Sequence, residues 1–330
     1  MSVDTDTPLD ASARTAAAIA FLARHRSVLV AYGIVVLLFV VGTIHSSDYA
    51  GIANIRSLLI YGSTIGIAAF GQGLCILTGG IDLSIPWTMT GSAVLTAELA
   101  NGKTSGLAGI FLLIAGLAIA VGLVNGIGIA YANVPPIIMT LGTQGALQGL
   151  VLVYTNGGGS ATAPAGLQTW ITTNFLGLPK QAWIWLVIAI GATIMLNRGT
   201  LGRRLYAIGT NANAAFLAGN RVRATLVVPY VISALSGALA GILLMAFNGG
   251  AYFSLGDPYL FATAAAVAVG GASILGGTGT YIGTVAGALT LTLIVSLLTL
   301  FDVGQAWLNI AYGAILLLAL LIAAPRSLRE

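Results

Sequence analysis

Between Thr104 and Leu178 the sequence contains no charged residue, and most of this stretch is apolar. Soluble domains are about 25% charged, whereas only 7% of this chain is charged and 58% of it is hydrophobic. Inside a bilayer only helices and closed barrels satisfy the backbone polar groups, and apolar runs of this length favour helices. The sequence therefore predicts an all-α polytopic membrane protein.

The apolar runs divide the chain into spans. Crossing the hydrocarbon core takes roughly 20 apolar residues, and we accept about 15 where glycine or proline indicates a broken or re-entrant element. On this basis we expect about ten transmembrane helices, some of them short or broken. The predicted spans are 28–44, 55–77, 85–100, 106–130, 136–153, 182–196, 225–247, 260–275, 280–300 and 305–323.

The basic residues predict the orientation of these spans. Cytoplasmic loops carry an excess of Lys and Arg, and a cytoplasmic N-terminus leaves only Arg56, Lys103 and Lys180 outside. We therefore expect both termini in the cytoplasm. The predicted organisation is an N-terminal cytoplasmic segment at 1–26, one transmembrane domain at 27–324 with a cytoplasmic loop at 197–224, and a C-terminal cytoplasmic tail at 325–330.

The cytoplasmic loop concentrates the charge of the chain. Five of the 13 basic residues lie within it, namely Arg198, Arg203, Arg204, Arg221 and Arg223. A soluble partner of this membrane protein would have to bind at this loop.

A carboxylate, Asp82, lies between the second and third spans in the run Thr78–Met89. Ionisable residues within a membrane are functional candidates by default. The structural alternative is that Asp82 or Ser84 caps the following helix, with Pro86 in its first turn.

A polar face is predicted on the helix that Pro135 and Pro136 begin. Thr140, Thr143, Gln144 and Gln148 recur at helical spacing, so they share one side. Lipid cannot satisfy such a face. It either lines a path for a hydroxylated solute or holds helices together.

Glycines four residues apart predict close helix packing. The pairs are Gly122 with Gly126, Gly145 with Gly149, Gly237 with Gly241, and the triple Gly279, Gly283 and Gly287. The run 270–279, which includes Gly276 and Gly277, predicts a break between two short helices.

The sequence offers no constellation for catalysis, metal binding or nucleotide binding. The run 97–104 ends in Gly-Lys-Thr but lacks the first glycine of a phosphate-binding loop and joins two spans. Cys75 is a lone cysteine, and His25 and His45 lie outside the spans. We therefore expect neither an enzyme nor a cofactor bound by this chain, and no nucleic-acid partner.

Four blocks in this order resemble the permease subunit of ribose-type sugar importers of the ATP-binding-cassette class, within the binding-protein-dependent sugar and branched-chain amino acid permease family. They are TGGIDLS at 78–84, VPPIIMTLGT at 134–143, TLGRRLYAIGTN at 200–211 with AAFLAG at 214–219, and GGASILGGTGT at 270–280.

The resemblance implies a bacterial inner-membrane protein that works with a second permease subunit, identical or related. A cytoplasmic ATPase pair binds ATP and Mg²⁺, and an extracytoplasmic binding protein delivers the sugar. The coupling element that contacts the ATPase is placed at Asn211–Gly219 by this match. Its contact residues are Arg203, Arg204, Asn211, Asn213, Ala214, Ala215, Phe216, Leu217 and Gly219. Ala212 and Phe216 depart from the family pattern, which has proline and arginine at these positions.

The implied mechanism is alternating access for a pentose or hexose. Sugar hydroxyls need hydrogen-bonding partners along the path, and the candidates are Gln72, Asn125, Thr140, Gln144, Gln148 and Asn248. Import of branched-chain amino acids, nucleosides or another metabolite by the same architecture is an alternative. An ion-coupled secondary transporter is a second one, but it needs intramembrane carboxylates, and only Asp82 and Glu98 are available.

Overall fold

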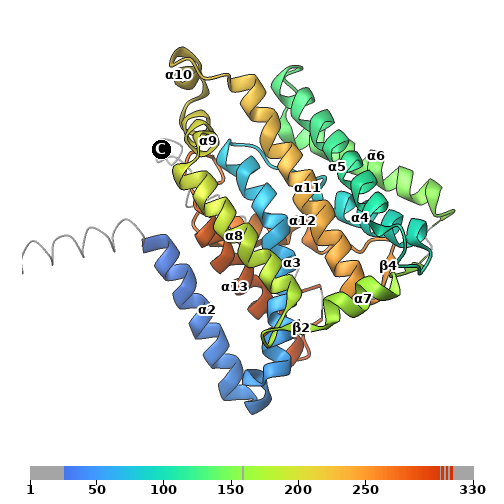
Figure 1. Ribbon diagram of the computed structural model, residues 1–330. Helices are drawn as coiled ribbons and strands as arrows, with labels where there is room; N and C mark the ends of the chain where they lie inside the picture. The colour runs from blue at the N-terminus through green and yellow to red at the C-terminus, as the bar shows by residue number, and fades with distance from the viewer. Residues whose placement is uncertain (1–25, 158–159, 305, 308–309, 311–312, 315–330) are drawn as a thin grey trace, which may run out of the picture.

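The computed structural model describes residues 26–157, 160–304, 306–307, 310 and 313–314. Most of this part is helical, and Figure 1 shows the long helices packed side by side in one bundle. The helices are α2 (Arg26–His45), α3 (Ile52–Leu77), α4 (Ile85–Ala100), α5 (Leu107–Ala130), α6 (Pro136–Tyr154), α7 (Ala165–Thr172), α8 (Lys180–Arg198), α9 (Thr200–Thr210), α10 (Ala212–Leu217), α11 (Val222–Asn248), α12 (Tyr259–Val269) and α13 (Tyr281–Leu300). A 3-10 turn, η1, covers Ser47–Ala50, and the short strands are β1 (Ser160–Thr162), β2 (Asn174–Phe175), β3 (Leu178–Pro179) and β4 (Gly250–Tyr252).

Within the described part, 7 helices are long and apolar enough to cross a membrane: α2, α3, α5, α6, α8, α11 and α13. Their bounds follow the predicted spans to within a few residues, which agrees with a polytopic all-α membrane protein. The predicted number of ten is not reached among the described residues. The expected tenth span, 305–323, lies mostly outside them.

Two expected spans are shorter than a membrane-crossing helix. α4 has the predicted bounds but only 16 residues, and most of them are buried inside the bundle. α12 ends at Val269 and not at 275, because Gly271 takes a φ of +87° and the chain turns away before Tyr281 begins α13. The predicted break at 270–279 is therefore confirmed, although the helix that follows it is long.

α11 is the central helix of the bundle and packs against α5, α3 and α4 (Figure 1). Glycine makes these contacts close. A Cβ at Gly122 or Gly126 of α5 would overlap the backbone of α11, and one at Gly241 of α11 would overlap the backbone of Met89. Gly283 and Gly287 bring α13 equally close to α12. The packing prediction is confirmed for these glycines.

Gly145 and Gly149 differ from the other glycine pairs. A Cβ at either position would meet nothing within 4 Å. Their face of α6 is exposed in the single chain, so the prediction that they pack closely is wrong within this chain.

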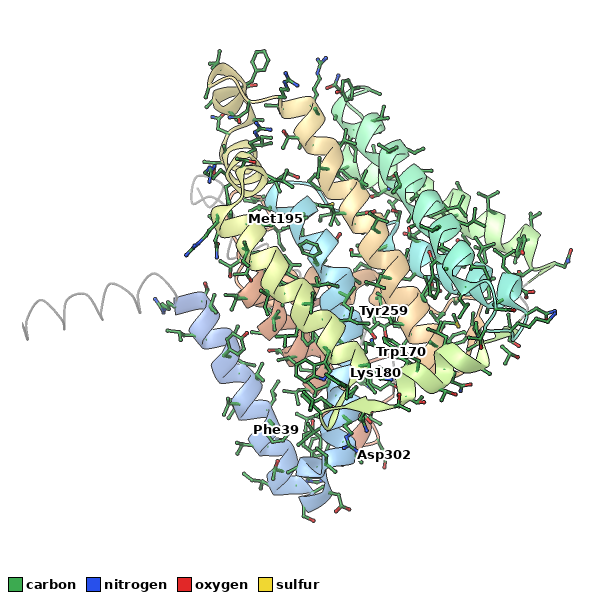
Figure 2. The ribbon with its side chains drawn as sticks, viewed as in Figure 1. Phe39, Trp170, Lys180, Met195, Tyr259 and Asp302 are labelled. Atoms are coloured by element: carbon green, nitrogen blue, oxygen red, sulfur yellow. The ribbon has the colours of Figure 1, made fainter. Side chains whose placement is uncertain are left out.

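One end of the bundle gathers the segments that the basic residues assigned to the outside. β1 pairs with β4 in antiparallel register, and Arg56 Nε donates to the Gly177 carbonyl at 3.0 Å. Lys180 Nζ lies 5.0 Å from the Trp170 ring centroid, and Figure 2 shows both residues at this end. The loop 197–224 lies at the other end (Figure 1).

The first residues of α2 lie at the same end as that loop. A Cβ at Gly271 would touch Ser27, and the neighbouring Gly279 carbonyl accepts a hydrogen bond from Tyr206 of α9. The start of α2 and the basic loop therefore share one end, as the positive-inside pattern predicts. Residues 1–25 and 315–330 lie outside the described part.

Candidate functional site

The basic loop folds into two helices, α9 and α10, which project from one end of the bundle (Figure 1). Asn211 ends α9 and caps α10, because its side-chain oxygen accepts the Ala214 N–H at 2.9 Å. Gly219 takes a φ of +82° directly after α10, a conformation that glycine adopts at little cost. Asn211 and Gly219 thus bound a separate helical element at the predicted position.

The tip of this element is apolar and exposed. Phe216 is 68% exposed and Leu217 is 84% exposed, whereas Ala215 beside them is buried against the loop. Asn213 and Ala214 are also exposed. Exposed patches of large apolar side chains commonly mark binding surfaces. This tip therefore has the character of a surface that binds in an apolar cleft of a soluble partner.

The helix that precedes the tip carries exposed arginines. Arg203 and Arg204 on α9 are exposed, and Arg203 also donates to the Arg198 carbonyl at 3.0 Å. No acidic side chain pairs with them within the described part of the chain. They remain available to an acidic partner or to anionic lipid.

The end of α9 packs on two neighbouring places where the chain leaves a helix, namely the end of α3 and the 270–280 loop that follows α12. The backbone of Gly209 lies against Leu77 and Gly277 with no room for a Cβ, and the Gly277 N–H donates to the Leu77 carbonyl at 2.9 Å. The Tyr206 hydroxyl donates to the Gly279 carbonyl at 2.6 Å, and partial burial raises the pKa of this hydroxyl. The end of α9, the end of α3 and the 270–280 loop therefore form one junction.

Gly276 and Gly277 hold this junction together. Their φ angles are +93° and +77°, and side chains there would press on Gly79, Gly209 and Thr210. A movement of α10 would thus reach the ends of α3 and α12 through directly packed backbone.

Asp82 anchors a buried hydrogen-bond chain between α3 and α4. Its Oδ1 accepts from the N–H and the hydroxyl of Ser84, at 2.9 and 2.6 Å. Asn125 Nδ2 of α5 donates to Ser84 Oγ at 2.9 Å, and Thr143 of α6 donates to Asn125 Oδ1 at 2.5 Å. Asp82 thus holds the turn before α4 and, through Ser84, ties it to α5 and α6.

Gln72 and Thr140 support the same turn from two sides. Gln72 Oε1 accepts the Asp82 N–H at 3.1 Å, and Thr140 Oγ1 accepts the Leu83 N–H at 3.1 Å. Both side chains, like that of Asn125, are fully buried. The structure thus brings three of the six proposed pathway residues into one internal network, and their role in a solute path stays a prediction.

The other three pathway candidates lie elsewhere. Gln144 is half-buried, and its Oε1 has no hydrogen-bond partner in the described chain. Gln148 is exposed on α6, and Asn248 is exposed at the end of α11. Of the six, Asn248 alone among the described residues borders a large cavity.

That cavity is the feature that the sequence analysis missed. It measures about 730 Å³ and lies between the first half of α3, the end of α11, the start of α12 and the end of α13. Tyrosines line it together with Asn54 and the hydroxyls of α13. The nearest signal in the sequence is the set of tyrosines Tyr49, Tyr61, Tyr252 and Tyr259, but they come from separate segments.

These features describe a polytopic membrane protein with an exposed helical element, α9–α10, at one end of its bundle. The chain belongs to a family of transport permeases, because residues 54–325 match the family model described as branched-chain amino acid transport system, permease component. It is a transport subunit by this membership, and the α9–α10 element and the junction described above are parts of it.

Curated relatives cover nearly the whole chain. The ribose import permease protein of Escherichia coli (strain K12) is 33% identical over 293 residues, which are 88% of this chain and 91% of the relative. The autoinducer 2 import system permease protein of Salmonella typhimurium (strain LT2) is 32% identical over 304 residues, 90% of this chain and 87% of the relative. No solved structure matches this chain.

Proposed function

We propose that this chain is the permease subunit of an ATP-driven, binding-protein-dependent importer of a sugar. The observation that carries the proposal is the α9–α10 element: α10 carries an exposed apolar tip, and the end of α9 directly before it packs on the junction with the end of α3 and the 270–280 loop. The ribose and autoinducer 2 import permeases among its relatives support a sugar-type solute. The chain works by alternating access, in which movement of α10 is transmitted to the helix breaks.

The other components of the proposed transporter are separate proteins. A cytoplasmic ATPase pair binds ATP and Mg²⁺ and receives α10, and an extracytoplasmic binding protein docks at the opposite end, where β1 and β4 lie. The chain resides in the bacterial inner membrane with both termini in the cytoplasm, which agrees with the basic residues gathered around α9.

Co-purification and uptake test this function together. A tagged chain isolated from gently solubilised membranes should bring down an ATPase with phosphate-binding loops. Uptake of a labelled sugar should fall to background when the phosphate-binding lysine of that ATPase is replaced. Uptake that survives the loss of the ATPase would instead support an ion-coupled carrier.

A second permease subunit packs on α6 in this proposal. Gln148 lies 12 residues into α6, which is about 18 Å along the helix at 1.5 Å per residue, and it is exposed. A glutamine at that depth cannot hydrogen-bond to lipid. Beside it lie Gly145 and Gly149, where an added Cβ would meet nothing within 4 Å. The neighbouring Gln144 Oε1 has no hydrogen-bond partner within the described chain. Another permease chain would cover this face and supply a hydrogen-bond partner for the exposed amide of Gln148.

Photo-crosslinking tests this interface. Benzoylphenylalanine at position 148 should form an adduct with a second permease chain, and its mass tells an identical partner from a related one. The same probe in place of Val36, which is 62% exposed on α2, should react with lipid alone. An interface on another face would leave position 148 without a protein adduct.

A further inference from the structure

The cavity between α3, α11, α12 and α13 opens at the end opposite α9 and α10. Asn54 and Tyr61 border it from the first half of α3, and Asn248 borders it from the end of α11. α11 has 27 residues and is therefore about 40 Å long at 1.5 Å per residue. The cavity and the coupling element thus lie at opposite ends of the same central helix.

The size of the cavity matches that of a small-molecule site. Its volume of about 730 Å³ falls within the range of about 300–1,000 Å³ that such sites occupy. The rings of Tyr61 and Tyr252, 43% and 47% exposed, supply aromatic surface at its border. Tyr61 is held in place by an edge contact with Phe247, with centroids 5.8 Å apart. A solute with an apolar ring face can therefore rest on a fixed aromatic wall.

Polar groups with unused hydrogen-bonding capacity line the same space. Asn54 Nδ2 donates to the Tyr49 carbonyl at 2.8 Å, which fixes the amide on the cavity wall. Asn248, Ser296 and Thr299 line the same space. The amide and hydroxyl oxygens of these side chains can accept hydrogen bonds from the hydroxyls of a solute.

The wall carries no net charge. Among the described residues that line the cavity there is no Asp, Glu, Lys or Arg. An amino acid brings a carboxylate and an ammonium group, and both lose hydration without a charged partner in such a site. A neutral solute with several hydroxyls loses far less hydration free energy when it enters the same site.

We infer that this cavity is a binding site, within the single permease chain, for a neutral polyhydroxylated solute on its way from the outer end into the membrane. The inference rests on the proposed function and adds to it the place where the solute is received. Asn248 is then a contact of the solute, whereas Gln72, Asn125 and Thr140 do not border this cavity.

The test fills the cavity without touching the coupling element. The complete transporter is expressed in cells, and uptake is measured with labelled D-ribose, D-xylose, D-glucose and L-leucine. Ser296→Phe on the wall should lower uptake of the transported neutral sugar by about tenfold or more. Val36→Phe, which adds the same ring on the exposed side of α2 away from the cavity, should keep at least half of it.

Two controls and a second variant separate loss of solute binding from misfolding or loss of coupling. The amount of each variant in the membrane and the ATP hydrolysis stimulated by the binding protein should stay within about twofold of the unaltered complex. Asn248→Leu, at the exposed mouth, serves as the second variant if Ser296→Phe does not accumulate, and it should raise the sugar concentration for half-maximal uptake. Unchanged ATP-dependent uptake in both variants would overturn the cavity site and leave the proposed function standing.

Two other results would also count against the inference. Preferred ATP-dependent uptake of L-leucine would contradict the neutral solute. A tightly bound lipid seen by native mass spectrometry in the unaltered complex and absent from Ser296→Phe, together with normal sugar uptake, would identify the cavity as a lipid site. The absence of any ATPase-dependent uptake by the unaltered complex would overturn both the inference and the proposed function.

Discussion

Phe216→Asp should abolish solute uptake while the chain still inserts and the ATPase still hydrolyses ATP. Phe216 is 68% exposed at the tip of α10, and burying a Phe side chain in a partner is worth about 1.5–3 kcal/mol. A carboxylate at this position loses that contact and must also be desolvated. Together these costs correspond to a loss of coupling of about 100-fold or more. The measurement is uptake beside ATP hydrolysis in reconstituted vesicles.

Phe216→Leu is the matched control for this substitution. Leucine keeps an apolar group on the same face of α10, so uptake should remain within about threefold of the unaltered chain, a difference below ~1 kcal/mol. Gly219→Asp, which forces a side chain into a φ of +82°, should resemble Phe216→Asp because it distorts the end of α10. Full uptake by both charged variants would place the docking site elsewhere.

Helix positions were predictable because length and apolarity are local properties. α3, α5, α6, α8, α11 and α13 begin and end within a few residues of the predicted spans. α4 and α12 were expected among the short or broken spans, at 85–100 and 260–275, and protein surrounds most of both helices in the structure. A helix enclosed by protein does not need the full membrane length, and no local pattern reports what encloses it.

The position of the α9–α10 element was predictable for a different reason. Arginine-rich polar sequence between long apolar runs has only an aqueous compartment to occupy, and Asn211 and Gly219 are the residue types that start and stop a short helix. The coupling role that the resemblance to known permeases implies for this element stays a prediction. What the sequence did not show is the junction below it, since Gly209, Leu77 and Gly277 meet only in the folded chain.

The polar residues show the limit of helical periodicity. Thr140, Thr143, Gln144 and Gln148 follow the predicted spacing along α6. Thr140 and Thr143 nevertheless face the buried chain around Asp82 and Ser84, whereas Gln148 is exposed. Spacing identifies residues that share a face, but the neighbouring helices decide which part of that face is covered.

Gly287→Ala should destabilise the folded chain, and Gly145→Ala should not, although the chemical change is the same. A Cβ at Gly287 would overlap the carbonyl of Ala266, so α13 and α12 would have to separate. Overpacking of this kind costs about 1–3 kcal/mol, which exceeds the gain of about 0.5–1 kcal/mol from replacing glycine within a helix. A Cβ at Gly145 would meet nothing within 4 Å. The alanine there brings the helix-propensity gain without any overpacking cost.

Thermal unfolding of the purified chain in detergent measures this contrast. Gly287→Ala should lower the apparent melting temperature and the yield of folded protein, and Gly145→Ala should leave them unchanged or slightly higher. In the assembled transporter position 145 becomes sensitive to substitution, because in our proposal the second permease subunit covers α6. The larger substitution Gly145→Leu should leave the single chain folded but reduce the amount of the second subunit that co-purifies with it. Equal melting temperatures for the two alanine variants would contradict the close approach of α12 and α13, whereas intact assembly of Gly145→Leu would contradict the interface on α6.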